Sequence, residues 1–286
     1  MSAELFALAT AFLRGFSTIP TRKGLQQGTA QSSALVYLLI NTMRLWGLTL
    51  LLYPLDHLTT QGLEYFVFAG IFAPGIARRF RDMEIFRLGV AVTSPIVATT
   101  TLFAVLFATV FLQEPMTVSL IVGAIFVVTG VNIVSYRRGM QRVRWHDLLY
   151  PLIAALLFAA STNIRKVGLQ TSDMPILGAV VTSSVSLLLL YVSSLWSRER
   201  HVSLLKLNAN TAKYFVVSSI TSSIAFLLYF LSLSQGLLVR VQPIAATNPL
   251  FAIFFSYLLL PDMERVTLQI VIGAILIFIG IVFVIS

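Results

Sequence analysis

The stretch Gly-Ala-Ile-Phe-Val-Val-Thr-Gly at residues 123–130 returns near the end of the chain as Gly-Ala-Ile-Leu-Ile-Phe-Ile-Gly at residues 273–280. A Glu and a Thr precede each copy at matching distances, with Glu114 and Thr117 before the first and Glu264 and Thr267 before the second. All of these pairs are 150 residues apart. Similarity at one fixed separation indicates that the chain contains an internal duplication.

Earlier in the two halves the same duplication continues. Ser94-Pro95-Ile96 corresponds to Gln242-Pro243-Ile244 at a separation of 148 residues. Residues 17–26, with Ser17, Thr18 and Gly-Leu-Gln at the end, correspond to residues 161–170 at a separation of 144. The separation drifts by only six residues, which small loop insertions explain. The sequence therefore predicts two repeats, residues 1–140 and 141–286.

The composition places both repeats in a membrane. Of the 286 residues, 57% are hydrophobic and 11% are charged, and the mean hydropathy is +0.89. A soluble protein of this length needs about twice as many charges, so a soluble globular enzyme is excluded. The chain has no cysteine, which excludes disulfides and thiolate metal sites, and its three histidines are isolated.

Apolar segments of about 20 residues, long enough to cross a bilayer as helices, follow one another with short links. Ten are expected, at residues 3–21, 31–54, 62–80, 88–112, 117–136, 147–167, 174–196, 212–234, 239–260 and 266–286. They lack the alternation of a β-barrel. Because each half holds five spans, the second half must enter the membrane from the opposite side. The predicted fold is an all-α integral membrane protein of ten transmembrane helices, arranged as two inverted five-helix repeats around a central cavity, the architecture of a secondary transporter.

The net charge of +9 belongs to the links, which favours cytoplasmic loops over a nucleic-acid surface. Odd-numbered links carry 15 of the Lys and Arg residues, and even-numbered links carry Arg165, Lys166 and Arg240. The positive-inside rule then predicts that the odd-numbered links are cytoplasmic and that both termini lie outside.

The order of several short motifs resembles the EamA branch of the drug/metabolite transporter superfamily over the whole chain. The motifs are Arg22-Lys23-Gly24-Leu25, Arg44 in the second segment, Pro74-Gly75-Ile76-Ala77-Arg78, Ser94-Pro95-Ile96 and Phe111-Leu112-Gln113-Glu114. This resemblance implies a metabolite exporter, with amino acids as a substrate class. One departure is that the first segment has Arg14-Gly15 where the family often has Trp-Gly.

Arg14 is the sharpest candidate for substrate binding. It lies about 11 residues into the first segment, roughly 16 Å deep at 1.5 Å per residue. Thr10, Ser17 and Thr21 share its helical face. A central Arg is costly in hydrocarbon, at about 2.5–3.5 kcal/mol, so it should face a cavity or a partner. No acidic residue falls at mid-membrane in the predicted segments, so Arg14 is interpreted as a residue that binds a substrate anion. The alternative is an Arg satisfied by carbonyls, hydroxyls and water.

The other candidate substrate-binding residues are polar groups inside the predicted helices. Each has an alternative interpretation as a helix-packing residue. They are Ser17, Thr18, Asn41, Arg44, Ser161, Thr162, Ser222, Tyr229 and Asn248. Ser222 and Tyr229 belong to a stripe with Ser218, Ala225 and Ser232, and Asn248-Pro249 is expected to interrupt the ninth helix.

Glycines and glutamates of the two fifth segments are given structural roles. Gly123 and Gly130, and likewise Gly273 and Gly280, are two helical turns apart, which indicates close helix packing. Glu114 and Glu264 are expected in short turns at the membrane surface, at helix entries.

No catalytic motif, metal spacing or phosphate loop is found, so the chain is expected to be no enzyme and to need no cofactor or metal. The predicted function is a secondary transporter of the plasma membrane, in bacteria the inner membrane, that moves a small, amino-acid-like or otherwise anionic metabolite, with export the expected direction. Alternatives are uptake or exchange of an anionic or phosphorylated metabolite and, in another class, a lipid flippase or lipid-modifying protein. The expected partners are a small-molecule substrate and membrane lipids, without nucleic acid, and a monomer suffices because one chain holds both repeats.

Overall fold

A computed structural model describes residues 2–52, 61–77, 80, 99–135, 149–172, 174–196, 208–259 and 268–285. Every regular element within these ranges is a helix. The first half contains α1 (Ser2–Leu25), α2 (Ala30–Leu52), α3 (Leu63–Gly70), the π-helical turn η2 (Ile71–Ile76), α6 (Thr100–Phe111) and α7 (Val118–Ser135). The second half contains α8 (Leu149–Ser172), α9 (Pro175–Trp196), α11 (Ala209–Gln235), α12 (Leu238–Ala245), α13 (Asn248–Leu259) and α14 (Leu268–Ile285).

Several of these helices are long and apolar enough to cross a membrane. Five described stretches meet that standard: Gln31–Leu52, Leu149–Ser172, Pro175–Ser193, Ala209–Gln235 and Leu238–Leu259. Four shorter apolar helices accompany them, at Leu63–Ala73, Thr100–Phe111, Val118–Ile133 and Val271–Val284. The prediction of an all-helical, multi-pass membrane protein is confirmed. Helix α1 is not among the five, because Glu4, Arg14, Arg22 and Lys23 make it less apolar.

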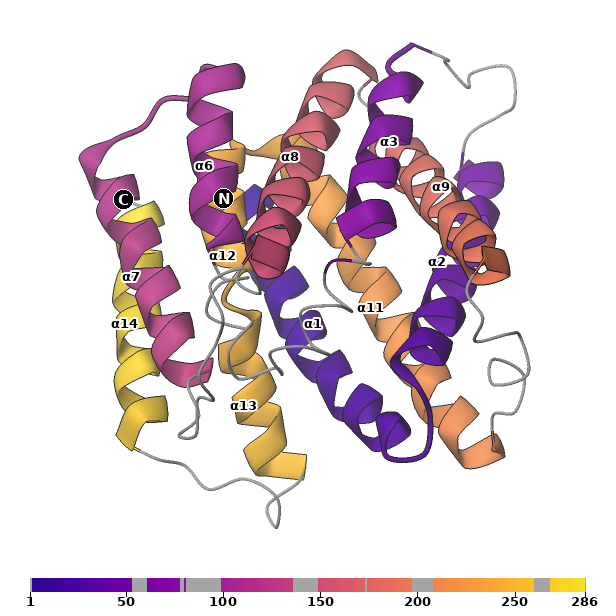
Figure 1. Ribbon diagram of the computed structural model, residues 1–286. Helices are drawn as coiled ribbons and strands as arrows, with labels where there is room; N and C mark the ends of the chain where they lie inside the picture. Colours follow the sequence, from indigo (N-terminus) through magenta and orange to yellow (C-terminus); the bar gives the residue numbers. More distant parts are fainter. Residues whose placement is uncertain are drawn as a thin grey trace.

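The last helices of the two halves pack against each other at glycines, as the sequence predicts. A Cβ atom on Gly123 would lie 2.7 Å from the carbonyl oxygen of Gly280, and one on Gly130 would lie 2.7 Å from that of Gly273. Helices α7 and α14 therefore run antiparallel at close range, side by side at one edge of the molecule (Figure 1). Corresponding helices of inverted repeats meet in this way.

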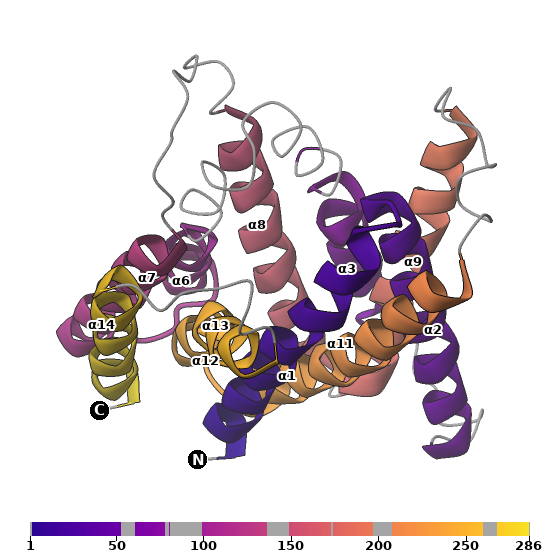
Figure 2. The ribbon, with the colours of Figure 1, turned by 90° about the horizontal axis from the view of Figure 1, so that it is seen from below.

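A second antiparallel pair joins the start of the first half to the second. Along α1 and α11, the Ser232 hydroxyl donates to the Ala3 carbonyl at 2.7 Å, and the Ser218 hydroxyl donates to the Ser17 carbonyl at 3.0 Å. The corresponding pair is α8 with α3, where the Ser161 hydroxyl donates to the Ala69 carbonyl at 2.7 Å. Figure 1 and Figure 2 show α1 and α11 lying alongside each other. The first helix of each repeat therefore packs against the third helix of the other repeat, and the two repeats share one interface.

Two helices are broken at proline. Ala73 has φ −150° and ψ 132°, the extended conformation that a following proline favours, and Pro74 has no N–H for the carbonyl of Gly70. The Ser186 hydroxyl of α9 donates to that carbonyl at 3.2 Å. In the second half, α12 ends at Ala245 and α13 begins at Asn248, so the expected interruption at Asn248-Pro249 is confirmed.

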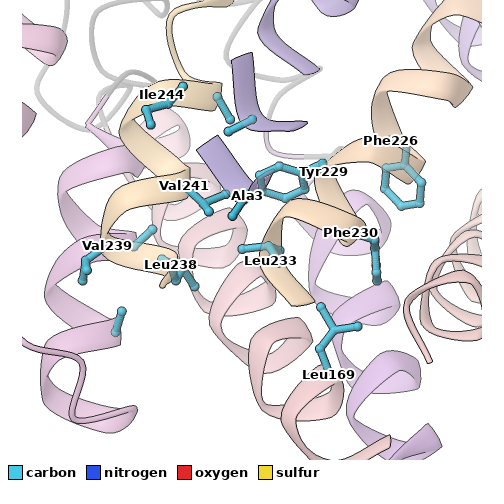
Figure 3. Packing of buried hydrophobic residues seen from close by; sticks show 14 of the residues in the cluster. Ala3, Leu169, Phe226, Tyr229, Phe230, Leu233, Leu238, Val239, Val241 and Ile244 are labelled. Atoms are coloured by element: carbon cyan, nitrogen blue, oxygen red, sulfur yellow. The ribbon is translucent and has the colours of Figure 1, made fainter. Parts of the chain in front are cut away.

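The apolar core draws on both repeats. Phe66 of α3 packs against Phe230 of α11, and Leu238, Val239 and Val241 of α12 belong to the same cluster. Figure 3 shows this packing from close by, with Tyr229 directed toward Ala3 and Val241 and with Phe226 and Phe230 on another side of α11. Tyr229 thus lies in the core, where α11, α12 and α1 meet.

Candidate functional site

Arg14 of α1 is brought to Tyr229 of α11. Its guanidinium carbon lies 4.9 Å from the centre of the Tyr229 ring, a cation–π contact. Arg14 is half-buried, whereas Tyr229 is buried. The polar face of α1 predicted from the sequence is the face that packs on the small and polar stripe of α11, because Thr10 contacts the Ala225 carbonyl there. The polar face of α1 and the small and polar stripe of α11, which were interpreted separately in the sequence, therefore form one interface.

The hydroxyl of Tyr229 joins two further helices. It donates a short hydrogen bond to Oε1 of Gln242 in α12. The Thr162 hydroxyl of α8, which donates to the Phe158 carbonyl at 3.0 Å, lies beside the Tyr229 phenol. Gln242 corresponds to Ser94 in the repeat alignment and was not predicted as a site residue. Together with Arg165, which is described next, these residues form what we call the Tyr229 cluster: Arg14, Thr162, Arg165, Tyr229 and Gln242.

Arg165 of α8 brings a second guanidinium to this place. It is buried, and its carbon lies 5.7 Å from the ring centre of Phe226 and 5.6 Å from that of Phe230. Its Nη2 donates to the Ala73 carbonyl at 2.6 Å, at the extended residue inside η2. Its guanidinium lies close enough to that of Arg14 for the two like charges to interact. Its Nε is buried without a hydrogen-bond partner in the described part of the chain.

The Tyr229 cluster is positively charged. It holds two guanidinium groups, and none of its members is acidic. Within the described ranges, the Arg14 guanidinium makes the cation–π contact with Tyr229 and no hydrogen bond. A group of three or more potential metal ligands is likewise not found in the described ranges. The chemistry of this donor set suits an oxyanion.

Several predicted site residues lie at helix contacts near the cluster. The Ser17 hydroxyl donates to the Arg14 carbonyl at 2.8 Å, and the Thr18 hydroxyl donates to the Gly15 carbonyl at 2.6 Å. Thr18 is exposed, whereas Ser161 is buried and holds the broken third helix through the Ala69 carbonyl. Ser17 and Ser161 occupy corresponding positions in the two antiparallel helix pairs.

The two candidates in α2 lie in different surroundings. Asn41 is fully buried, its Nδ2 donates to Ser183 at 2.8 Å, and its Oδ1 accepts from Ser223 at 2.6 Å. Both ends of its amide are thus occupied by neighbouring helices. Arg44 is half-buried, and its Nε and Nη2 have no hydrogen-bond partner in the described ranges.

Ser222 and Asn248 are both half-buried. Ser222 lies on α11 beside Ser223, which is the serine bonded to Asn41. Asn248 opens α13, and its carbonyl oxygen would lie 2.9 Å from a Cβ atom placed on Gly15 of α1. Asn248 therefore lies against the residue that follows Arg14, at the break in the ninth segment.

Three charged residues lie elsewhere than the sequence predicts. Arg165 and Lys166 were assigned to a link, but α8 continues to Ser172 and buries both, with 7% and 6% of their surfaces exposed. Glu114 was expected in a surface turn, yet it is only 5% exposed. Its carboxylate accepts backbone N–H groups of α12, so it does meet a helix entry, but that of a helix in the other repeat. Glu264 lies outside the described residues.

The family model for EamA-like transporters matches the chain twice, at residues 1–136 and 146–286. The chain belongs to the EamA-like transporter family. It is a membrane transporter of the drug/metabolite type, built from two repeats. A solved structure titled only "Crystal structure of protein" has the same fold, with a TM-score of 0.79 and 14% identity over 99% of this chain and 96% of the other. No curated protein matches the sequence.

Proposed function

We propose that this EamA-like transporter is a secondary transporter of the plasma membrane, in bacteria the inner membrane, that moves a small anionic metabolite by alternating access. The observation that carries the proposal is the guanidinium of Arg14 over the Tyr229 ring, without a hydrogen bond to the residues that the structure describes. In a helix bundle, a cation that the protein leaves without a hydrogen bond is available to bind a ligand. A carboxylate or a phosphate group supplies the missing acceptors.

The charge of the surroundings supports an anion. Arg14 and Arg165 lie close enough to interact, and Arg165 is nearly fully buried. Two like charges in an apolar region are costly unless an opposite charge joins them. Glu114 does not serve this purpose, since its two oxygens are occupied by α12. A bound substrate anion would lower the free energy of the whole cluster.

The architecture supports alternating access. Inverted repeats that carry broken helices are the usual frame of secondary transporters, with the substrate near the repeat interface. The Tyr229 cluster draws its members from both repeats and lies close to the breaks at Ala73 and Thr247. The direction of transport, export, and the amino-acid-like character of the substrate are inferred from the resemblance to the family. The two guanidinium groups also fit a phosphoryl group, which favours uptake or exchange of a phosphorylated metabolite as the second candidate.

The test is a ligand-stabilisation screen of the purified protein. A panel of carboxylates, amino acids and phosphate monoesters, each beside its methyl ester, is scored by the rise in melting temperature. We expect acids to stabilise the wild type, their esters to have little effect, and Arg14→Gln to abolish the difference. Lys213→Gln, which removes an exposed cation from the start of α11, is the matched control and should behave as the wild type. Equal stabilisation by acid and ester would refute the anion proposal.

A further inference from the structure

Glu114 holds the start of α12. Its Oε1 accepts the N–H of Leu238 at 3.0 Å, and its Oε2 accepts the N–H of Val239 at 2.9 Å. The first N–H groups of a helix have no partner within it, and the helix dipole favours a negative charge there. Both carboxylate oxygens are used, and the side chain is buried. Glu114 comes from the first repeat and α12 from the second, so this cap crosses the repeat boundary.

Lys166 holds the end of α11 in a complementary way. Its Nζ donates to the carbonyls of Leu233 and Gly236, both at 2.7 Å. The last carbonyls of a helix have no partner within it and attract a cation. Lys166 is buried, and its charge interacts with that of Glu114. A buried cation and a buried anion thus hold the two sides of one turn, Gly236–Leu237.

The positions of these contacts relate directly to the Tyr229 cluster. Leu238, capped by Glu114, is four residues before Gln242, and Leu233, capped by Lys166, is four residues after Tyr229. Residues four apart lie on one face of a helix, one turn from each other. Each charged side chain therefore fixes the backbone one turn from one partner of the Tyr229–Gln242 hydrogen bond.

We propose that Glu114 and Lys166 are positioning residues of the transport site. They clamp the turn between α11 and α12 and so hold Gln242 against Tyr229, beside Arg14. Helix α12 has eight residues and is separated from α13 by the break at Ala246–Thr247, so the cap of Glu114 fixes the start of a short helix whose apolar residues are buried in the core. The effect of the clamp on ligand binding rests on the proposed function, whereas the clamp itself does not.

Hydrogen exchange of the purified, ligand-free protein tests the clamp. Glu114→Gln replaces one acceptor oxygen by a donor, so we expect the amides of Leu238 and Val239 to exchange at least tenfold faster. Glu64→Gln is the matched control, because Glu64 is an exposed residue in the first turn of α3. Lys166→Met should accelerate the same amides, Lys166→Arg should restore part of their protection, and Lys213→Met should leave them unchanged. Unchanged exchange in Glu114→Gln would overturn the clamp.

A binding experiment tests positioning. The probe is whichever of succinate, glutamate and glycerol 3-phosphate stabilises the wild type. We expect Glu114→Gln to raise its Kd about tenfold, and Tyr229→Phe to add little further in that background, because the hydrogen bond is already disturbed. Faster exchange with an unchanged Kd would overturn positioning and leave the anion site standing. Failure of all three probes to stabilise the wild type would count against the proposed function, while hydrogen exchange would still decide the clamp.

Discussion

The Arg14 guanidinium lies 4.9 Å from the centre of the Tyr229 ring, and this contact joins the first helix of one repeat to the third helix of the other. A ring face attracts a cation without accepting its N–H groups in ordinary hydrogen bonds. Tyr229 therefore stabilises the charge of Arg14 and leaves the donors of the guanidinium available. The pair both anchors α1 on α11 and presents a cation to a ligand.

Substitution of Arg14 separates binding from packing. Arg14→Gln should reduce transport at least tenfold with normal amounts of folded protein in the membrane, because it removes the charge that binds the anion. Arg14→Lys should keep part of the activity, since it retains charge but loses the planar fork of donors. The measurement is uptake or efflux in proteoliposomes, normalised to folded protein. Low yield with normal activity per folded molecule would show that Arg14 only packs.

Asn41 gives the opposite expectation. Its amide is occupied at both ends by Ser183 and Ser223, so Asn41→Leu should cost stability. Side-chain hydrogen bonds between membrane helices contribute about 0.6 kcal/mol on average. We expect a loss of roughly 1 kcal/mol, seen as a lower melting temperature, with unchanged ligand affinity. Thr221→Ala is the control, because the Thr221 hydroxyl donates to the Val217 carbonyl of its own helix. If Asn41→Leu instead lost ligand affinity at an unchanged melting temperature, Asn41 would be a substrate-binding residue.

The fold was largely predictable, because segments that repeat in the sequence form corresponding helices in the structure. The glycines at 123, 130, 273 and 280 predicted close helix packing, and the structure shows that the two helices pack against each other in antiparallel register. The interruption at Asn248-Pro249 followed from the missing N–H of proline. These features depend on local backbone chemistry, which a single sequence contains.

The site was only partly predictable, since it depends on contacts between distant segments. Arg165 and Lys166 were counted among the charges of an even-numbered link, whereas the structure buries both in α8. Their partners, the carbonyls of Ala73, Leu233 and Gly236, come from other helices and leave no local signal. One signal was present: both residues lie inside the predicted apolar segment 147–167, which conflicts with their assignment to a link.

The glycine contact between α7 and α14 predicts a sharp steric effect. Gly130→Ala would place a Cβ atom 2.7 Å from the backbone oxygen of Gly273, so the helices must separate. Overpacking of this kind costs about 1–3 kcal/mol. Gly47→Ala in α2 is the control, because no atom lies within 4 Å of the Cβ position there. Thermal unfolding in detergent should show a lower melting temperature for Gly130→Ala alone. Equal stability of the two variants would refute the close contact.

The distribution of charge predicts the orientation in the membrane. With Arg165 and Lys166 buried inside α8, Arg240 is the remaining cation of those assigned to even-numbered links, which strengthens the asymmetry. The turn between α1 and α2 lies at the opposite end of the helices from both termini (Figure 1). The positive-inside rule places that turn in the cytoplasm and the termini outside.

The chain has no cysteine, so Ser2→Cys and Gln27→Cys each introduce one exposed thiol. An impermeant maleimide applied to intact cells should label Ser2→Cys and spare Gln27→Cys until the membrane is opened. The reverse pattern would show that the arginine-rich links face outward.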